Sequence, residues 1–130
     1  MPHELKKITP NLVVSNVERS LAFYRDVLGF AVTATVPNAP PYVFAALSSG
    51  PIEVFLNARD AAVEEYPVLK DRSIGGTFTM FIEVVNIHQA YDTLKSQVKV
   101  IMPLEKKWYG VTEFAFQDQD GYVITFAERE

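Results

Sequence analysis

The sequence predicts an α+β fold made of two successive βαβββ modules. The segment ITPNLVVSNVERSLAFYRDVLGF in the first half has the same plan as GGTFTMFIEVVNIHQAYDTLKSQ in the second half: a short apolar strand, an asparagine and an amphipathic helix. Three strand candidates, separated by turn residues, follow each helix. With 130 residues, of which 48% are hydrophobic and 22% charged, the chain is long enough for one domain with a real core.

The two helices are predicted from their caps and their apolar spacing. Asn16 and Asn86, 70 positions apart, suit the N-cap because an asparagine side chain can accept a hydrogen bond from an otherwise unpaired amide. Gly29 is well placed to end the first helix. After each cap, apolar residues recur at the spacing of a helix that lies on a sheet. These residues are Val17, Leu21, Tyr24 and Leu28 in the first helix, and Ile87, Tyr91, Leu94 and Val98 in the second.

The strands complete the two modules. The predicted strands after the helices are Phe30–Val36, Tyr42–Leu47 and Ile52–Asn57 in the first half, and Lys99–Met102, Val111–Gln117 and Tyr122–Glu128 in the second. The modules then span residues 8–57 and 77–128 of a single domain 1–130. The linker 58–76 contains a short helix around RDAAVEEY, which Pro67 interrupts.

Composition and missing motifs exclude several functions. A net charge of −4 and a pI near 5.2 argue against a nucleic-acid partner. The chain has no cysteine, so it has no disulfide framework and no thiolate nucleophile. No apolar run approaches the roughly 18 residues of a membrane span, so we expect a cytoplasmic protein without a membrane partner. The P-loop, G-x-S-x-G, Rossmann glycine and H-E-x-x-H motifs are all missing.

Two segments carry a family resemblance. ITPNLVVSNVERSLAFYRDVLGF and EFAFQDQDGYVITFAE resemble the signature segments of the vicinal oxygen chelate superfamily. That superfamily includes glyoxalase I, the extradiol dioxygenases, the fosfomycin-resistance enzymes and the bleomycin-resistance binding proteins, and this chain is closest in style to the small bleomycin-resistance-like members. The resemblance implies that the sheets curl around a ligand cavity. It also implies a homodimer, in which some members exchange a module between chains.

The metal site of the family is predicted to be absent. In metal-using relatives, His, Gln or Glu on the first strand of each module and Glu on the last strand hold one divalent ion. Matching the motifs places Thr9 and Thr79 at the first-strand positions, and Glu53 and Thr125 at the last-strand positions. Threonine hydroxyls are poor substitutes for carboxylate or imidazole ligands. The two histidines, His3 near the N-terminus and His88 in the first turn of the second helix, are poorly placed to help, so we expect no metal and no other cofactor.

A ligand cavity without a metal, here called the cup, can still bind a small molecule. Trp108 and Tyr109 lie in the predicted turn KKWYG, where large aromatic residues suit stacking on a flat ligand. Either Glu113 or Phe114 faces the cup, because side chains alternate along a strand. The acidic pI favours a cationic or aromatic ligand over an anion. The predicted ligand-binding residues are Thr9, Glu53, Phe55, Thr79, Trp108, Tyr109, Glu113 and Thr125.

Three functions remain open at this point. The leading hypothesis is a metal-free protein that sequesters a small organic ligand; Glu53 is the only candidate for a catalytic residue. The alternative is a lyase, isomerase or dioxygenase, either metal-dependent or using Glu53 as a general base if burial raises its pKa. The third is an interaction domain whose cup is filled by side chains. For Trp108, the simpler alternative is packing at the dimer interface. For Glu113, it is an exposed position on a strand.

Overall fold

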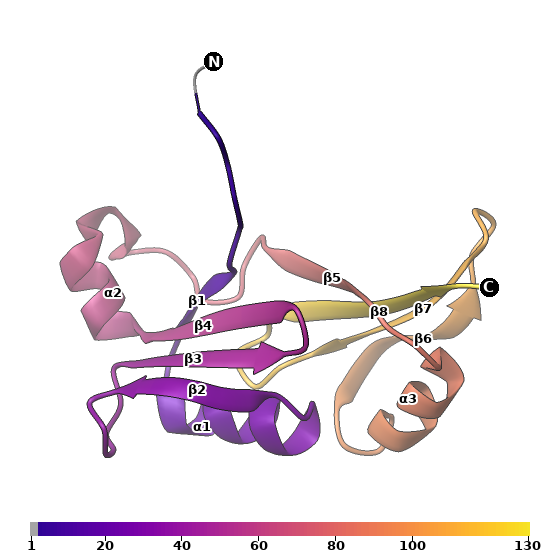
Figure 1. Ribbon diagram of the computed structural model, residues 1–130, viewed down its shortest axis with the longest axis horizontal. Coiled ribbons are helices and arrows are strands. Elements are labelled where there is room, and N and C mark those ends of the chain that lie inside the picture. Colours follow the sequence, from indigo (N-terminus) through magenta and orange to yellow (C-terminus); the bar gives the residue numbers. More distant parts are fainter. Residues whose placement is uncertain (1–2) are drawn as a thin grey trace. The chain divides into compact units, whose positions relative to one another are not determined.

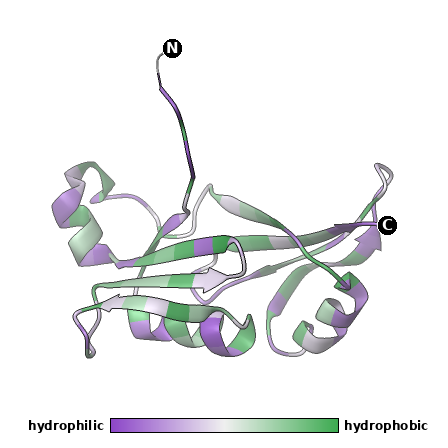
Figure 2. Cartoon of the chain, in the orientation of Figure 1, coloured by the Kyte–Doolittle hydropathy of each residue, from purple (hydrophilic) through white to green (hydrophobic). Residues whose placement is uncertain are grey.

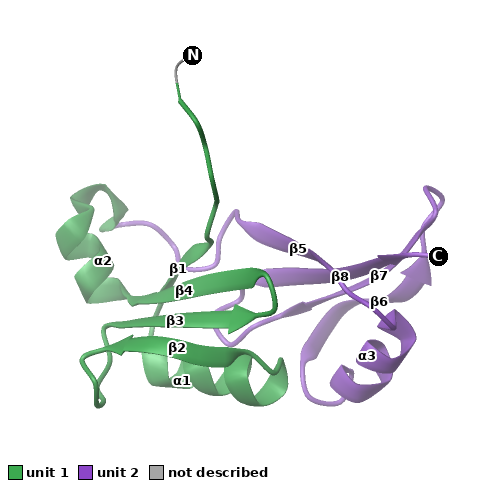
Figure 3. Ribbon diagram, in the orientation of Figure 1, with its two compact units in different colours: residues 1–70 green, residues 71–130 purple. Residues whose placement is uncertain are grey.

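The computed structural model describes residues 3–130. The chain divides into two compact units, residues 1–70 and 71–130 (Figure 3). The boundary lies inside the predicted linker, so the linker helix belongs to the first unit.

The first unit is a four-stranded mixed sheet with helices packed on it (Figure 1). The sheet order is β1-β4-β3-β2, with β1 parallel to β4 and the other pairs antiparallel. The elements are β1 (Asn11–Val14), α1 (Val17–Ala22), the π-helical turn η1 (Phe23–Val27), β2 (Ala31–Val36), β3 (Phe44–Ser49), β4 (Ile52–Ala58), α2 (Arg59–Glu65) and the 3₁₀ turn η2 (Pro67–Leu69).

The second unit repeats the first in a shorter form. Its sheet order is β5-β8-β7-β6, again with the first pair parallel and the others antiparallel. Its elements are β5 (Thr79–Glu83), α3 (Ile87–Leu94), β6 (Lys99–Lys106), β7 (Val111–Gln117) and β8 (Val123–Arg129). The predicted α+β fold of two βαβββ modules is therefore confirmed, each module forming one mixed four-stranded sheet.

Strand β6 is longer than predicted, because Pro103 does not end it. The prediction stopped at Met102, yet the strand continues to Lys106. Since β6 is an edge strand, the missing N–H of Pro103 can face away from the sheet at no cost in pairing. Register shifts relative to β7 absorb the irregularity on either side of Met102.

Each sheet has one face covered by a helix. In the first unit, α1 packs on β3 and β4, and the buried side chains Val54 and Leu56 point to that side. Glu53, Phe55 and Asn57 alternate with them and lie on the opposite face. Both apolar (green) and polar (purple) residues occur along the helices in Figure 2, as expected of amphipathic helices on a sheet.

In the second unit, an aromatic cluster lies between the sheet and α3. The Tyr91 ring of α3 meets Phe114 of β7 with 5.0 Å between ring centroids. Phe114 also contacts Phe116 and Phe126, and both Phe114 and Phe116 are fully buried. Edge-to-face and offset ring pairs of this kind contribute about 0.5–1.5 kcal/mol each beyond their buried area. Phe114 therefore faces the helix, which places Glu113 on the other face of the sheet.

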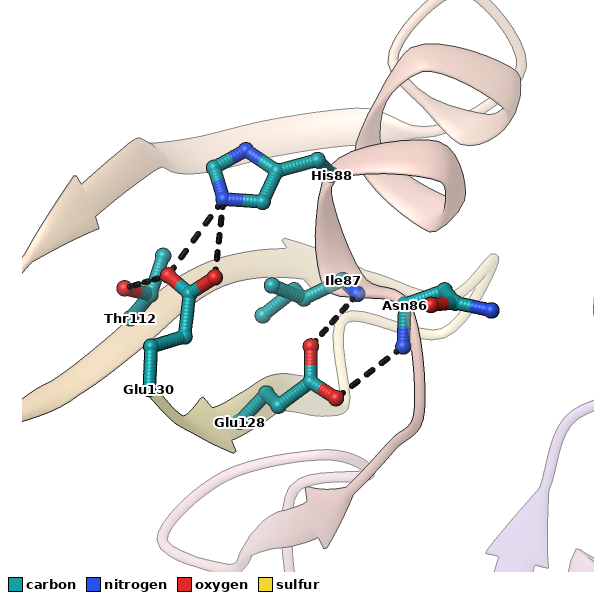
Figure 4. A network of polar contacts seen from close by, with 6 residues as sticks. All are labelled: Asn86, Ile87, His88, Thr112, Glu128 and Glu130. Carbon is teal, nitrogen blue, oxygen red and sulfur yellow. Dashed lines mark hydrogen bonds and ion pairs between the residues drawn. The ribbon is translucent and has the colours of Figure 1, made fainter.

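The two helix N-termini are capped in different ways. The Asn16 side chain accepts a hydrogen bond from the Arg19 amide at 2.8 Å, as predicted. Asn86 occupies the predicted N-cap position of α3, but the predicted hydrogen bond is wrong: this residue has φ 62°, and its side chain makes no cap hydrogen bond. Glu128 of β8 replaces it, accepting from the amides of Asn86 at 3.1 Å and Ile87 at 2.9 Å (Figure 4). A carboxylate at this end also interacts favourably with the helix dipole.

The neighbouring carboxylate ties the end of the chain to the same helix. Glu130 accepts a hydrogen bond from the Thr112 hydroxyl at 2.5 Å and lies 3.1 Å from Nε2 of His88 (Figure 4). The hydrogen bond from Thr112, aided by the charge of His88, lowers the pKa of Glu130 below its ordinary value. The His88 side chain is 65% exposed, so it lies on the solvent side of α3.

The turn between β7 and β8, which contains the sequence QDQDG, is organised by an aspartate. The Asp118 carboxylate accepts from the amides of Asp120 at 2.9 Å and Tyr122 at 3.0 Å. Gly121 has φ 89°, a conformation that glycine adopts without strain. These side-chain hydrogen bonds give the acids of the turn a structural role.

Candidate functional site

The candidate site is a pocket in the second unit, formed by the end of β6, the following turn and the start of β7. Its volume is about 760 Å³. It is lined by Met102, Glu105, Lys106, Lys107, Trp108, Tyr109 and Glu113. Trp108, Tyr109 and Glu113, three of the predicted ligand-binding residues, thus come together in one place.

A tight turn presents the two aromatic residues. The Lys107 amide donates to the Val111 carbonyl at 2.8 Å, and the Gly110 amide donates to the Lys107 carbonyl at 3.1 Å. Gly110 has φ 86°, so the turn needs glycine at this position. Trp108 is 94% exposed and Tyr109 45% exposed, and their rings meet edge-to-face with 5.2 Å between centroids. The predicted position of both residues on a turn is confirmed.

Glu113 is the acid of the pocket. It is only 6% exposed, and one of its oxygens, Oε2, accepts a hydrogen bond from the Tyr109 hydroxyl at 2.8 Å. This bond to a carboxylate, with burial adding to it, raises the pKa of Tyr109. The hydrogen bond also holds the Glu113 side chain against the pocket wall. The alternative that Glu113 is a plain exposed residue is wrong.

A second carboxylate lies across the strand pair. Glu105 of β6 is directly opposite Glu113 in the register of the two strands. Like charges directly opposite each other in an antiparallel pair are destabilising. Lys107 compensates one of them, with its Nζ 3.0 Å from Glu105 Oε2. Lys106, the other cation of the lining, acts on Glu130, whose pKa it helps to lower.

Glu53 is held by other groups in the first unit. Its Oε1 is 2.5 Å from Lys7 Nζ and 3.5 Å from the Thr9 hydroxyl, which donates to it. The Glu53 side chain is 27% exposed and paired with Lys7, so it is not the buried, unpaired carboxylate that the enzymatic alternative expects. Phe55, on the same face, packs its ring against Phe44 at 5.1 Å between centroids.

The register of the parallel strand pairs shows that Glu53 and Thr125, which were expected to be at equivalent positions in the two modules, are not equivalent. The β1–β4 pair matches Asn11 with Phe55, and the β5–β8 pair matches Phe81 with Thr125. Because the repeat has an offset of 70, Thr125 occupies the position of Phe55 and not that of Glu53. The counterpart of Glu53 is Val123, which lies opposite Thr79. The spacing of 72 residues between Glu53 and Thr125 is therefore not a slip in the repeat, because these two residues are not at equivalent positions.

The residues at the four family positions do not fit a divalent ion. Three of the four are threonines, and the one carboxylate, that of Glu53, is already paired with Lys7. Mg²⁺, Mn²⁺ and Fe²⁺ need several converging carboxylate, carbonyl or imidazole ligands. Within residues 3–130, no three His, Cys, Asp or Glu side chains are grouped closely enough to hold a metal ion.

Four lining residues were not predicted: Met102, Glu105, Lys106 and Lys107. The sequence prediction ended the strand before three of them and treated KKWYG only as a turn. Their place in the pocket depends on the register between β6 and β7, which is interrupted twice by irregularities. Sequence spacing alone does not fix such a register.

The comparison with known families identifies the superfamily of this chain. The sequence pattern of the Glyoxalase/Bleomycin resistance protein/Dioxygenase superfamily matches residues 5–126. The chain belongs to this superfamily. The recognition made from the two signature segments is thereby confirmed. No curated protein sequence gives a significant match.

Solved structures of the superfamily share the fold. A member from Sphaerobacter thermophilus is 24% identical, with a TM-score of 0.76 and coverage of 96% of this chain and 98% of that one. A bleomycin-binding protein from Streptomyces verticillus, complexed with copper(II)-bleomycin, is 20% identical, with a TM-score of 0.66 and coverage of 98% and 99%. TioX from Micromonospora is 17% identical, with a TM-score of 0.77 and coverage of 96% and 99%. At these identities the likeness concerns the fold.

Across residues 3–130, the helices are too short or too polar for any of them to cross a bilayer.

Proposed function

We propose that this member of the superfamily is a metal-free protein that binds and sequesters a small aromatic molecule carrying a positive charge. The observation that carries the proposal is the buried Glu113 carboxylate, held by Tyr109 beside the exposed Trp108. Of the carboxylates in the pocket, Glu105 already has a lysine partner, whereas the described contact of Glu113 is with a neutral phenol. A ligand cation would supply the missing positive charge.

The aromatic residues supply the rest of the binding energy. A Trp side chain that is 94% exposed offers nearly its whole ring face to a ligand. A cation placed over such a ring gains about 0.5–1 kcal/mol at an exposed site, and about 2 kcal/mol when it is desolvated. Stacking of a flat ligand adds apolar burial at about 25 cal/mol per Å². Sequestration needs only this stacking, a suitable shape and the acid.

The structural likeness supports a binding role. The protein from Streptomyces verticillus, which has the same fold, holds copper(II)-bleomycin. We extend from it only the class of function, a small molecule bound by this fold. In line with the family, we also propose that the protein acts as a homodimer. No nucleic-acid or membrane partner is included in the proposal.

The other predicted ligand-binding residues lie outside this pocket. Thr9, Glu53 and Phe55 belong to the first unit, and Thr79 and Thr125 are on β5 and β8. Their role in ligand binding stays a prediction. Nothing in their contacts favours the enzymatic alternative, because Glu53 is paired with Lys7 and is partly exposed.

Matched aromatic probes test the proposal. Trp108 is the sole tryptophan, so quenching of its emission reports directly on this pocket. We expect 1-naphthylmethylammonium to bind more tightly than neutral 1-naphthalenemethanol, and both to bind more tightly than 1-naphthoate. Calorimetry on the same samples separates binding from optical artefacts.

Glu113→Gln is the decisive variant. It should weaken binding of the cationic probe by about 10- to 100-fold, because a hydrogen bond to a charged group contributes about 1.5–3 kcal/mol. Binding of the neutral probe should hardly change. The control is Glu64→Gln on the exposed side of α2, which removes the same charge elsewhere. Equal affinity for all three probes, or an unchanged affinity in Glu113→Gln, would contradict the proposal.

A further inference from the structure

The carboxylate of Glu113 has one oxygen that is hydrogen-bonded and one that is open. The Tyr109 hydroxyl donates to Oε2 at 2.8 Å, and within residues 3–130 it is the one hydrogen-bond donor that contacts this carboxylate. The other oxygen, Oε1, is not among the completely enclosed polar atoms of these residues that lack a hydrogen bond. Because Glu113 lines the pocket and is otherwise buried, Oε1 is open on the pocket side, where a ligand can contact it.

The two lysines of the pocket interact with other carboxylates. Lys107 Nζ is 3.0 Å from Glu105 Oε2, and the charge of Lys106 acts on Glu130. A carboxylate that is only 6% exposed has lost most of its hydration, and a missing donor leaves part of that loss uncompensated. Glu113 therefore requires a hydrogen-bond donor from the ligand as well as a positive charge.

The two aromatic residues of the turn offer a different kind of recognition. The rings of Trp108 and Tyr109 stand at 90° to each other, with 5.2 Å between their centroids. Aromatic walls suit a quaternary ammonium group, which has no N–H and binds over ring faces. Trp108 is 94% exposed and Tyr109 45% exposed, however, so a cation beside these rings remains largely in water.

The two kinds of recognition differ in size. A cation placed over an exposed ring gains about 2- to 5-fold in affinity. A hydrogen bond to a charged group changes affinity by about 10- to 100-fold. The Glu113 carboxylate therefore outweighs the rings in the choice of the cation, and the rings serve mainly to stack on the flat part of the ligand.

We infer that the pocket selects a protonated amine, which is a cation with at least one N–H, over a quaternary ammonium ion. The N–H of the amine donates to Oε1 of Glu113, while the Tyr109 hydroxyl continues to donate to Oε2. One N–H is enough, because one carboxylate oxygen is open. This inference rests on the proposed function and names the class of cation that the pocket binds.

A graded series of N-methylated probes tests the inference on the natural chain. The series is 1-naphthylmethylammonium and its N-methyl, N,N-dimethyl and N,N,N-trimethyl derivatives, which all carry one positive charge at neutral pH. Calorimetry should show at most about a 3-fold change at each of the first two methyl groups, and a loss of about 10-fold or more at the third. Only the third methyl group removes the last N–H, so the first two are internal controls for size and hydration. The pocket volume of about 760 Å³ leaves room for all three.

Two variants show which group causes the loss at the third methyl. In Glu113→Gln, the one amide oxygen accepts from Tyr109 and an NH₂ group replaces Oε1, so this loss should shrink to less than about 3-fold. In Trp108→Phe, all four probes should bind more weakly by a similar factor, and the loss at the third methyl should persist. Calorimetry is needed for this variant, because it removes the sole tryptophan. Circular dichroism and melting curves check that both variants are folded.

The outcomes separate this inference from the proposed function. A loss at the third methyl that disappears in Glu113→Gln and persists in Trp108→Phe supports the inference. Four equal affinities, or tightest binding of the trimethyl probe, would overturn it while leaving the preference for cations intact. A loss that survives in Glu113→Gln would also overturn it, because the carboxylate would not be the cause. Four cations that bind no better than neutral 1-naphthalenemethanol would overturn the proposed function as well.

Discussion

At the scale of single residues, the decisive feature is the setting of Glu113. Alternation along β7 places Phe114 in the aromatic core under α3 and turns Glu113 to the other face. There the carboxylate is nearly buried and accepts the Tyr109 hydroxyl. A buried carboxylate keeps its charge only if hydrogen bonds or nearby cations compensate for the lost hydration. One hydrogen bond from a phenol is a small compensation, and this supports the proposal of a cationic ligand.

The Tyr109–Glu113 contact can be tested by pH titration. The contact raises the pKa of Tyr109 above its ordinary value of 10.0, because ionising the phenol would break the hydrogen bond and place two negative charges together. Glu113→Gln removes the charge, so the pKa of Tyr109 should move down towards 10.0. Near-ultraviolet absorption titration measures tyrosine ionisation, and Tyr109→Phe identifies the step that belongs to this residue among the six tyrosines. Identical titration curves for the natural chain and Glu113→Gln would show that the contact is not made in solution.

At the scale of elements, the two modules start their helices by different means. In the first module, Asn16 caps α1 with its own side chain. In the second, Asn86 has a left-handed backbone, and the cap comes from Glu128 at the end of a strand distant in the sequence. The repeat thus preserves the residue and the capped helix while changing the group that makes the hydrogen bond.

Three substitutions distinguish the two caps. Asn16→Ala and Glu128→Ala should each lower the free energy of unfolding by about 1 kcal/mol, the usual effect of losing an N-cap. Asn86→Gly should leave stability nearly unchanged, because no side-chain cap is lost and glycine adopts positive φ freely. Urea unfolding followed by circular dichroism measures the differences. If Asn86→Gly were as harmful as Asn16→Ala, the assignment of the second cap to Glu128 would be wrong.

At the scale of the whole molecule, the internal repeat organises both units. The offset of 70 residues that relates Asn16 to Asn86 also relates the pair Asn11–Phe55 to the pair Phe81–Thr125. Both units keep the mixed sheet of the superfamily, yet within residues 3–130 no three His, Cys, Asp or Glu side chains are grouped closely enough to hold an ion. The fold has therefore been retained without the donor chemistry used by metal-dependent relatives.

Removal and addition of metal test this statement. Dialysis against EDTA should change neither the melting temperature nor the binding of 1-naphthylmethylammonium. Adding Mg²⁺, Mn²⁺ or Zn²⁺ should likewise leave the melting temperature unchanged. If the protein had a metal site, a free metal concentration of 100 times the Kd would stabilise the folded state by about 2.7 kcal/mol. Elemental analysis of the purified protein gives an independent measurement. A stoichiometric ion together with a rise in melting temperature would refute the metal-free assignment.

The sequence by itself determined the fold of each unit. Helix periodicity, turn residues and the repeat predicted two βαβββ modules, and the prediction for Val111–Gln117 matches β7 residue for residue. It also placed Trp108 and Tyr109 on a turn. These features follow from local rules, such as side-chain alternation and the conformational preferences of glycine and aspartate, which act over a few residues.

Only the tertiary structure decided which side chains meet. The pairing of Glu105 with Glu113 depends on a register with two irregularities, and the pairing of Thr125 with Phe81 depends on how β8 lies against β5. Glu128 replaces Asn86 as the cap because the two segments become neighbours in space. Strand register and contacts between distant segments are set by packing over the whole sheet, where a shift of one residue reverses the face of every side chain. No local pattern in the sequence carries that information.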